Sequence, residues 1–482
     1  MLNRKRTKIV ATISDKNCEP DFIRNLYEAG MDVVRINSAH LEIEGALRII
    51  RNVRKVSDKI AILIDTKGPE IRTTDCDEPV NIQTGTVIRM AGDSGKKTTP
   101  EVIHVNLRSI ADEVPVGSRV MIDDGEIVFR VIGKDRDRDM LILKSENMGL
   151  IGSRKSVNVP GVKIDLPSLT DKDRIFIQMA AANDIEFIAH SFVRRKQDVL
   201  DVQAEIDKYN SGIKIIAKIE NQEGVENIND ILDVVYGIMV ARGDLAIEIP
   251  YEKIPTLQKM IISRCIYCRK PVIVATQMLH SMITNPRPTR AEVSDIASAV
   301  YSQTDALMLS GETAAGNYPV EAVRTMTKVA LEVERNKEKL LETPFINVTG
   351  EISSYLAKVA VETSLRIGAR GIIADTSGGR TIRDMASYRG FNLILAQCYT
   401  TRAMRELALS YGVYTSYQEP RDSIDQFIHI ALSNLISEYD FRGDDKVVVL
   451  AGNFSGGNGF SFIEVGTVEY LNKRIGFLQD MN

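Results

Sequence analysis

Eight short runs of apolar, mostly β-branched residues recur between residues 8 and 312, and this recurrence constrains the fold more than any other feature. Amphipathic segments separate most of the runs, which is the pattern of parallel strands joined by helical crossovers. Eight such units predict a (β/α)8 TIM barrel. The predicted strands are residues 8–13, 33–37, 61–66, 187–192, 214–220, 237–242, 271–277 and 306–312. The predicted helices are residues 21–29, 42–57, 171–183, 197–209, 225–235, 256–269, 290–303 and 318–341.

The third predicted strand is not followed at once by its helix, because residues 68–165 intervene with a different pattern. Their short β-rich segments and turn signals predict a small β-barrel or β-sandwich inserted into the TIM barrel; we adopt the β-barrel. An insertion after strand three must stand at the carboxyl ends of the strands, where active sites of this fold are built. We therefore expect a mobile lid. The predicted strands of the lid are 86–91, 118–122, 126–132 and 140–144, with turns at 123–125 and 133–135.

The last part of the chain begins after a polar stretch and shows a fresh alternation of helices and strands, with strands predicted at 371–376, 393–398, 446–451 and 462–468. This pattern predicts a separate α/β domain. The predicted domains are a catalytic barrel at 1–67 and 166–341, a lid at 68–165 and a C-terminal α/β domain at 342–482.

Composition excludes several classes of protein. A net charge of −4 over 482 residues, with both signs interspersed, gives no basis for a nucleic-acid partner. The longest apolar runs are too short to cross a membrane, so we expect a cytoplasmic protein. Five cysteines are too few for a disulfide framework, and we expect reduced thiols. Cys265 and Cys268 lie three apart on one predicted helix face, which favours packing over metal or redox chemistry.

Polar residues cluster at the predicted carboxyl ends of the strands, where functional groups of a barrel lie. Glu220 and Asp244 are the only acidic side chains at the ends of the neighbouring fifth and sixth strands. Two carboxylates that leave other positions open suit a Mg²⁺ or Mn²⁺ ion, which also takes substrate oxygens. The alternative is that each carboxylate forms a structural salt bridge with Lys218 or Arg242.

Lys218 lies two residues before Glu220, so both side chains should leave the same side of the strand. A cation and a metal would then converge on one anion, as phosphoryl or enolate chemistry requires. Arg35 and Arg72 can add positive charge, and Thr276 can hold substrate or relay a proton. There is no Walker A sequence and no G-x-G-x-x-G after the first strand, so those nucleotide-binding folds are disfavoured.

With these residues assembled, the chain resembles the pyruvate kinase family over nearly its whole length. Seven motifs occur in family order, each at a predicted strand, at its end or in the helix that follows. They are KIVATI at 8–13, DTKGPEIR at 65–72, KIEN at 218–221, ARGDL at 241–245, ATQML at 275–279, PTRAEVSD at 288–295 and LSGETA at 309–314.

The resemblance implies an enzyme of glycolysis, a phosphotransferase that moves the phosphoryl group of phosphoenolpyruvate to ADP to give pyruvate and ATP. It implies that Glu220 and Asp244 bind Mg²⁺ and that Lys218 stabilises the developing enolate. Lys218, Arg35, Thr276 and Arg72 would form the catalytic set. The substrate contacts implied are Arg35, Lys218, Gly243, Asp244 and Thr276, and the nucleotide contacts are Asn37, His40, Arg72 and Lys155.

The resemblance also implies a monovalent cation, usually K⁺, bound by Asn37, Asp65 and Thr66. Glu70 is typical of family members that require K⁺. The family stretch R-L-N-F-S-H-G appears here as R-I-N-S-A-H-L at 35–41, so Ala39 replaces the usual serine ligand. We still expect a K⁺ requirement, with an affinity that depends on this substitution.

A glycine-containing turn in the last domain lies between a predicted strand and a helix, where backbone N–H groups and hydroxyls favour phosphate. It resembles the loop that holds a sugar-phosphate effector in this family; the alternative is simply a tight turn. A second glycine-rich loop, 452–459, could close over a sugar-phosphate or nucleotide effector. The resemblance further implies an allosteric homotetramer. The residues of the turn are Thr376, Ser377, Gly378, Gly379, Arg380 and Thr381.

Two other functions are weighed against this one. Another Mg²⁺-dependent barrel enzyme acting on phosphoenolpyruvate or pyruvate, such as a lyase or aldolase, could share the paired carboxylates and the arginines. The lid and the nucleotide residues argue against it. A sensor that binds sugar phosphate but has lost catalysis is disfavoured because Lys218, Glu220, Asp244 and Thr276 are all present.

Overall fold

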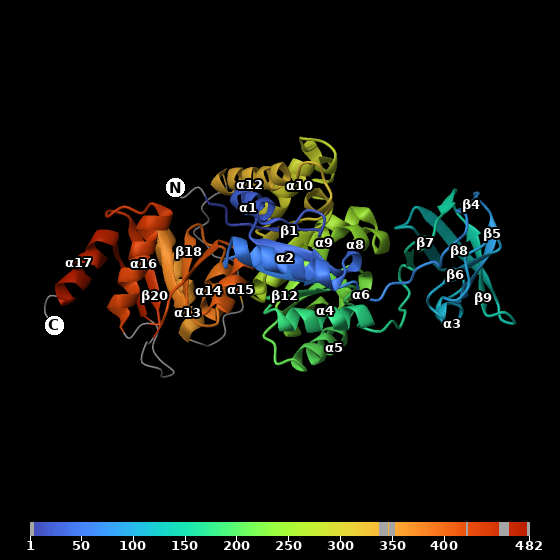
Figure 1. The fold of residues 1–482 in the computed structure, drawn as a ribbon, viewed down its shortest axis with the longest axis horizontal. Helices are drawn as coiled ribbons and strands as arrows, with labels where there is room; N and C mark the ends of the chain where they lie inside the picture. Colours follow the sequence, from blue (N-terminus) through green and yellow to red (C-terminus); the bar gives the residue numbers. More distant parts are fainter. Residues whose placement is uncertain (1–3, 337–345, 347–351, 421–422, 453–461, 480–482) are drawn as a thin grey trace.

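The computed structural model describes residues 4–336, 346, 352–420, 423–452 and 462–479. Figure 1 shows three units in a row, with the barrel in the centre, a β-rich lid at one end and an α/β domain at the other. A closed parallel barrel, an extra β-rich unit and a C-terminal α/β unit confirm the predicted fold class. No helix in these residues is both long and apolar enough to span a bilayer.

The barrel closes where β1 pairs with β16, for example through Ala11 and Leu309. Around the ring the strand order is β1, β16, β15, β14, β13, β12, β3 and β2. Its interior is filled by apolar side chains such as Val10, Leu63 and Met239. The eight strands are β1 (Lys8–Thr12), β2 (Val33–Asn37), β3 (Ala61–Asp65), β12 (Phe187–His190), β13 (Lys214–Ile219), β14 (Gly237–Ala241), β15 (Val272–Ala275) and β16 (Ala306–Leu309).

Helices cover the outside of the barrel, and their local signals agree with the sequence. Thr170 and Asp173 form the capping box that opens α4, and Gly30 ends α1 with a φ of 120°. The predicted helix 225–235 is instead two helices, which part at Asn227. The helices are α1 (Pro20–Ala29), α2 (Ile43–Val56), α4 (Asp171–Ala182), α5 (Lys196–Asp207), α6 (Gln222–Glu226), α7 (Ile228–Val234), α8 (Arg242–Glu248), α9 (Ile254–Tyr267), α10 (Arg290–Tyr301), α11 (Gly311–Ala314) and α12 (Pro319–Asn336). The last residues of predicted helix 318–341 lie outside the described residues.

The lid contains more strands than the sequence predicted, because several of them are only two to four residues long. The turn predicted at 133–135 is wrong: these residues continue β8, which carries a bulge between Val131 and Gly133. The chain turns at 136–139 instead, where Asp139 has a φ of 53°. The lid elements are β4 (Val80–Ile82), β5 (Val87–Gly92), β6 (Val102–Val105), α3 (Ile110–Glu113), β7 (Arg119–Ile122), β8 (Ile127–Asp135), β9 (Met140–Ser145), β10 (Gly149–Ile151) and β11 (Val157–Asn158).

The C-terminal sheet has the order β19, β18, β17, β20 and β21, with β21 antiparallel to β20. The strand at β19 was not predicted. Its elements are α13 (Ile352–Arg366), β17 (Gly371–Thr376), α14 (Arg380–Ser387), β18 (Leu393–Cys398), α15 (Thr401–Glu406), β19 (Val413–Tyr417), α16 (Ile424–Tyr439), β20 (Lys446–Ala451), β21 (Phe462–Thr467) and α17 (Val468–Gln479).

The C-terminal domain packs against the amino ends of the barrel strands. Arg389 pairs with Asp305, just before β16, at 2.6 Å, and Lys8 at the start of β1 donates to the carbonyl of Val413 at 2.5 Å. The lid leaves the barrel after β3, at the carboxyl ends of the strands. The C-terminal domain and the lid therefore lie at opposite ends of the barrel, as Figure 1 shows.

Candidate active site

Strand alternation places the main polar residues of the site. Successive side chains of a strand point to opposite faces, so a residue two positions after an inward apolar residue also points inward. Arg35 follows Val33, Asp65 follows Leu63 and Lys218 follows Ile216, and each of these apolar residues packs inside the barrel. The barrel core therefore ends in a layer of charge at the carboxyl ends of the strands.

Lys218 lies at the centre of this layer. Its Nζ is 3.0 Å from Oδ1 of Asp65 and 3.0 Å from Oε1 of Glu220, and it donates to Oγ of Ser191 at 2.7 Å. Burial opposes the charge, but the two carboxylates outweigh it and raise the pKa of Lys218 above its ordinary value. The ammonium is therefore permanently charged and fixed in position.

Arg35 approaches the same carboxylate from the other side. Its Nε donates to Oδ2 of Asp65 at 2.7 Å, and its Nη1 donates to Oγ1 of Thr12 at 3.0 Å. Burial alone would raise the pKa of Asp65, but Lys218 and Arg35 hold it below the usual range. One buried carboxylate thus orients both cations.

Glu220 and Asp244 form the predicted carboxylate pair. Glu220 follows β13, and its Oε2 accepts from the backbone N–H of Phe192 at 2.6 Å. Burial and the neighbouring Asp244 raise the pKa of Glu220 to about 7, although Lys218 opposes the shift. Burial likewise raises the pKa of Asp244, which lies within hydrogen-bonding reach of Glu220. One buried and one partly buried carboxylate this close together fit a divalent cation between them.

Of the two structural salt bridges that were the alternative to a metal site, only one forms. Glu220 does pair with Lys218, but the Nη1 of Arg242 pairs with Asp295 at 2.7 Å instead of with Asp244. Arg242 and Asp244 were expected at a strand end, whereas β14 stops at Ala241 and both lie in the first turn of α8. No group of three or more His, Cys, Asp or Glu side chains in the described part of the chain could hold a metal by itself.

Thr276 sits on a strained turn after β15. Thr276 and Gln277 have φ values of 70° and 56°, a region that β-branched residues rarely adopt. The Oγ1 of Thr276 accepts from the N–H of Gly243 at 2.8 Å and donates to the carbonyl of Ala275. Arg242 donates to the Thr276 carbonyl at 2.6 Å, so the guanidinium holds the turn in place.

The residues expected to hold a monovalent cation are also neighbours. Asn37 pairs with Asp65 in the register of β2 and β3, and Thr66 follows directly. The Oδ1 of Asn37 accepts from the N–H of Ala39 at 3.2 Å. Ser38 is fully buried, and its Oγ has no hydrogen-bond partner in the described structure. The side-chain oxygens of Asn37, Asp65 and Thr66 are therefore neighbours here even though the side chain of Ala39 supplies none.

Two of the four expected nucleotide residues come together in the lid. An isolated β-bridge joins Arg72 to Ser156, the residue after Lys155, and the N–H of Thr73 donates to the Lys155 carbonyl at 2.8 Å. Arg72 pairs with Glu70 at 2.7 Å and Lys155 with Asp123 at 2.6 Å. Asn37 and exposed His40 belong to the barrel, and among the described contacts none joins them to the two lid cations.

Comparison with known proteins decides the family. The family model for the pyruvate kinase barrel domain matches residues 4–323, and that for the pyruvate kinase alpha/beta domain matches residues 355–465. The chain belongs to the pyruvate kinase family. It is 45% identical to the pyruvate kinase of Borreliella burgdorferi over 470 residues, covering 96% of this chain and 98% of that one. It is 41% identical to that of Geobacillus stearothermophilus over 459 residues, covering 93% and 78%.

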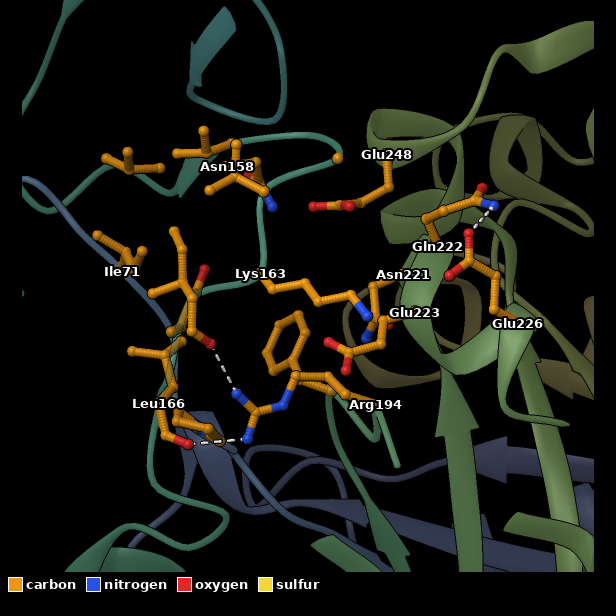
Figure 2. Close-up of a pocket in the computed structure, with 18 residues that line it drawn as sticks. Ile71, Asn158, Lys163, Leu166, Arg194, Asn221, Gln222, Glu223, Glu226 and Glu248 are labelled. Carbon is orange, nitrogen blue, oxygen red and sulfur yellow. Dashed lines mark hydrogen bonds between the residues drawn. The ribbon is translucent and has the colours of Figure 1, made fainter. Parts of the chain in front are cut away.

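The pyruvate kinase barrel of this chain meets its lid at a cavity of about 250 Å³ (Figure 2). Arg194 donates to the carbonyls of Ile164 at 2.9 Å and Leu166 at 2.8 Å, and it pairs with Asp198 at 3.0 Å. Arg194 therefore fixes the segment in which the chain returns from the lid, around Ile164 and Leu166, to the barrel. In Figure 2 the Lys163 side chain extends from that segment toward Asn221, next to the candidate metal ligand Glu220.

The candidate effector turn lies at the carboxyl end of β17. The N–H of Gly379 donates to Oγ1 of Thr376 at 2.7 Å, and Gly379 has a φ of 77°. Arg380 and Thr381 begin α14, while Ser377 and Gly378 are exposed. These contacts fit both a phosphate loop and a tight turn. Most of the second loop, 452–459, lies outside the described residues.

Sequence reasoning missed three residues that organise the pyruvate kinase site. Ser191 accepts from Lys218, Thr12 accepts from Arg35, and Asp295 fixes Arg242. Ser191 and Thr12 lie at the ends of the fourth and first strands, so the rule that active residues follow strand ends would have found them. Asp295 lies on α10, and only the fold brings it to Arg242.

Proposed function

We propose that this chain transfers the phosphoryl group of phosphoenolpyruvate to ADP, giving pyruvate and ATP, as a phosphotransferase of glycolysis. One observation carries the proposal: Lys218 lies 3.0 Å from both Asp65 and Glu220 at the carboxyl ends of the barrel strands. A fixed cation beside a candidate metal site is what a reaction that develops negative charge requires. Membership of the pyruvate kinase family supports the same reaction.

Glu220 and Asp244 would hold Mg²⁺ or Mn²⁺, and Asn37, Asp65 and Thr66 would hold K⁺. When bound, these ions would supply positive charge to the phosphoryl oxygens. Burial is the first cause of the raised pKa values of both Glu220 and Asp244, and this supports a cation between them, because such an ion would offset the cost of burying their charges.

Arg35 and Lys218 would bind and orient the anionic substrate, since both are held by Asp65 before any ligand arrives. As the bond between phosphorus and the enol oxygen breaks, that oxygen gains negative charge, and Lys218 would stabilise it. The phosphorus forms its new bond to a terminal oxygen of ADP. The enolate carbon then takes a proton from water to give pyruvate.

Gly243 and Thr276 would contact the substrate from the turn that Arg242 supports. Asn37 and His40 would contact the nucleotide from the barrel, and Arg72 and Lys155 from the lid. Closure of the lid would bring the two pairs together and exclude water from the phosphoryl group. We therefore expect ADP-dependent turnover to need both the two barrel residues and the two lid residues.

We further propose an allosteric, cytoplasmic homotetramer, in which the turn from Thr376 to Thr381 binds a sugar-phosphate or nucleotide effector. Support for the effector comes from the exposed Ser377 and Gly378 at the start of a helix. Support for the assembly comes from the family alone. Titration of sugar phosphates and nucleoside monophosphates into the activity assay tests the effector, and sedimentation tests the tetramer.

The decisive test of the reaction is pyruvate production by the purified chain with Mg²⁺, K⁺ and phosphoenolpyruvate, with and without ADP. The proposal predicts pyruvate only when ADP is present, with one ATP formed for each pyruvate. Turnover that is equally fast without ADP would instead identify a barrel lyase or another enzyme acting on phosphoenolpyruvate, and it would overturn the proposal.

A further inference from the structure

The chain passes between the barrel and the lid twice, and on the way out Asp173 anchors it. The N–H groups of Lys67 and Gly68, which follow β3, both donate to Oδ1 of Asp173, at 2.9 Å and 3.4 Å. Asp173 is fully buried in the first turn of α4, where its Oδ2 accepts from the N–H and the hydroxyl of Thr170. One carboxylate therefore caps a barrel helix and also holds the start of the outgoing connection.

The returning connection has its own anchor, Arg194. Its guanidinium holds the carbonyls of Ile164 and Leu166 and is oriented by Asp198, a buried carboxylate in the first turn of α5. Asp198 also accepts from the hydroxyl of Ser168 at 3.1 Å, just beyond the held carbonyls. The neighbouring helices α4 and α5 thus each use a buried carboxylate of the first turn to fix one connection to the lid.

The anchored backbone leads directly into the packing of the lid. Ile71, three residues after Gly68, is buried in the lid core, and Ile164 and Leu166 pack against that core. The cavity of about 250 Å³ separates these segments from the barrel, and Pro69, Ile71, Ile164 and Leu166 all help to line it (Figure 2). Groups that face a cavity have fewer packing partners, so we expect the connections to bend beside it and the anchored ends to stay in place.

The two lid cations proposed to hold the nucleotide depend on these anchors for their place. Arg72 directly follows buried Ile71, and its Nη1 donates to the carbonyl of Arg154, the residue before Lys155, at 2.6 Å. Arg72 and Lys155 therefore belong to one body with the lid core. A shift of either anchored end would move both cations relative to the barrel.

We propose that Asp173 and Arg194 are positioning residues for the reaction, because they fix the two pivots on which the lid turns and so set where its cations meet the nucleotide. This inference rests on the proposed function, which assigns Arg72 and Lys155 to ADP. A misplacement of about 1 Å in such a contact can cost about 100-fold in rate. Loss of an anchor should therefore weaken ADP binding far more than binding of the divalent ion, whose proposed ligands both belong to the barrel.

The key variant is Arg194→Lys, which keeps a cation beside Asp198 but lacks the planar fork of donors that reaches both carbonyls. The matched control is Arg195→Lys, because Arg195 holds the same segment only through an exposed ion pair with Asp165, which a lysine can also form. Asp173→Glu tests the other anchor. It moves the accepting oxygens by one methylene, and glutamate at this position keeps the capping box of α4.

Three measurements on the full chain separate positioning from a general loss of structure. They are ADP binding by calorimetry with Mg²⁺ present, Mn²⁺ binding by electron paramagnetic resonance, and the KM values for ADP and phosphoenolpyruvate. We expect Arg194→Lys and Asp173→Glu to weaken ADP binding about tenfold or more and to raise the KM for ADP in step, while Mn²⁺ affinity and the KM for phosphoenolpyruvate change less than about threefold. Arg195→Lys should leave all of these values unchanged.

ADP affinities of both anchor variants that match Arg195→Lys would overturn the proposal. Equal losses of ADP and Mn²⁺ binding would also overturn it, because they would show that the anchors only maintain the fold. Asp173→Glu keeps the test valid if Arg194→Lys fails to fold. A wild type that binds ADP but forms no ATP would refute the proposed function alone, since the binding measurements still decide the role of the anchors; a wild type that binds no ADP would refute both.

Discussion

The ammonium nitrogen of Lys218 lies 3.0 Å from Oε1 of Glu220, so the cation expected at the reacting oxygen already contacts a proposed metal ligand. Glu220 is thus shared between a fixed cation and the site of a divalent ion. Asp65 holds the other side of the same ammonium at 3.0 Å. Substrate would therefore meet a preformed cluster and cause little rearrangement of these groups.

Lys218→Met should lower kcat by about 10²- to 10³-fold, because the lost charge acts most strongly on the enolate oxygen in the transition state. Binding of Mn²⁺, measured by electron paramagnetic resonance, should persist, since Glu220 and Asp244 remain. Lys214→Met, at the amino end of the same strand, is the matched control. A kcat for Lys218→Met within threefold of wild type would contradict the role.

Thr276→Val should reduce activity more than Thr276→Ser does. Valine keeps the shape of threonine but leaves the N–H of Gly243 without the oxygen that accepts from it at 2.8 Å. Serine retains that oxygen. Steady-state kinetics of the two variants provide the comparison. Equal rates would show that the Thr276 hydroxyl does not contribute to activity.

Ala39→Ser should lower the K⁺ concentration needed for half-maximal activity, because it restores an oxygen beside Asn37. Titration of K⁺ against Na⁺ in the ADP-coupled assay measures the shift. Ser38→Ala, next to it in the chain, is the control and should change the titration less. Full activity without any K⁺ would refute both the proposed site and the use of Glu70 as its indicator.

Arg389→Met should destabilise the junction of the barrel and the C-terminal domain by about 3–5 kcal/mol, because it leaves Asp305 buried and unpaired. Adding Asp305→Asn to this variant should recover part of the loss, since the uncompensated charge is removed. Thermal unfolding of the single and double variants measures this, with exposed Arg366→Met as control. A midpoint for Arg389→Met that matches the control would contradict the expectation.

Lys8→Met should stabilise the protein at pH 7, and the gain should shrink as the pH rises. Burial lowers the pKa of Lys8 from 10.5 to about 8, although Asp32 opposes the shift. Below pH 8 the Lys8 ammonium stays charged in the folded protein, and its burial opposes folding fully. Between about pH 8 and 10.5 the folded protein releases this proton before the unfolded chain does. The free energy of unfolding of the wild type therefore rises with pH in this range.

The difference in unfolding free energy between Lys8→Met and the wild type should fall by about 1.4 kcal/mol per pH unit in that window. Thermal unfolding of both proteins at pH 7.5, 9 and 10 measures this difference. The control is Lys16→Met, which replaces an exposed lysine. A difference that stays constant or grows with pH would show that burial of this ammonium does not oppose folding.

The sequence predicted the barrel because it depends on short-range patterns, and the roles of the candidate site residues stay predictions. β-Branched runs mark the strands, and a spacing of two places Lys218 and Glu220 on one side. The lid was harder, since strands such as β10 and β11 are only three and two residues long and carry little alternation. Gly133 was predicted to lie in a turn, but it lies within β8 next to a bulge. The domain boundaries at 67, 165 and 341 stay predictions.

Long-range partners could not be predicted. Asp295 reaches Arg242 from a helix 53 residues away. The end of a strand marks Ser191 as a candidate residue, but its contact with Lys218, 27 residues away, depends on the fold. Asp244 was expected just beyond a strand predicted to end at Arg242, but β14 ends at Ala241 and the chain enters α8 directly. Such contacts depend on how the strands are staggered around the barrel, which no local pattern encodes.

The most direct test follows the phosphoryl group itself. Phosphoenolpyruvate labelled with ³²P is mixed with an excess of wild-type protein, ADP, Mg²⁺ and K⁺ for a single turnover, and the products are separated. We predict that the label appears in ATP in equal amount to the pyruvate formed, and that Lys218→Met slows this transfer. Label recovered as inorganic phosphate at the rate of pyruvate formation would contradict direct transfer to ADP.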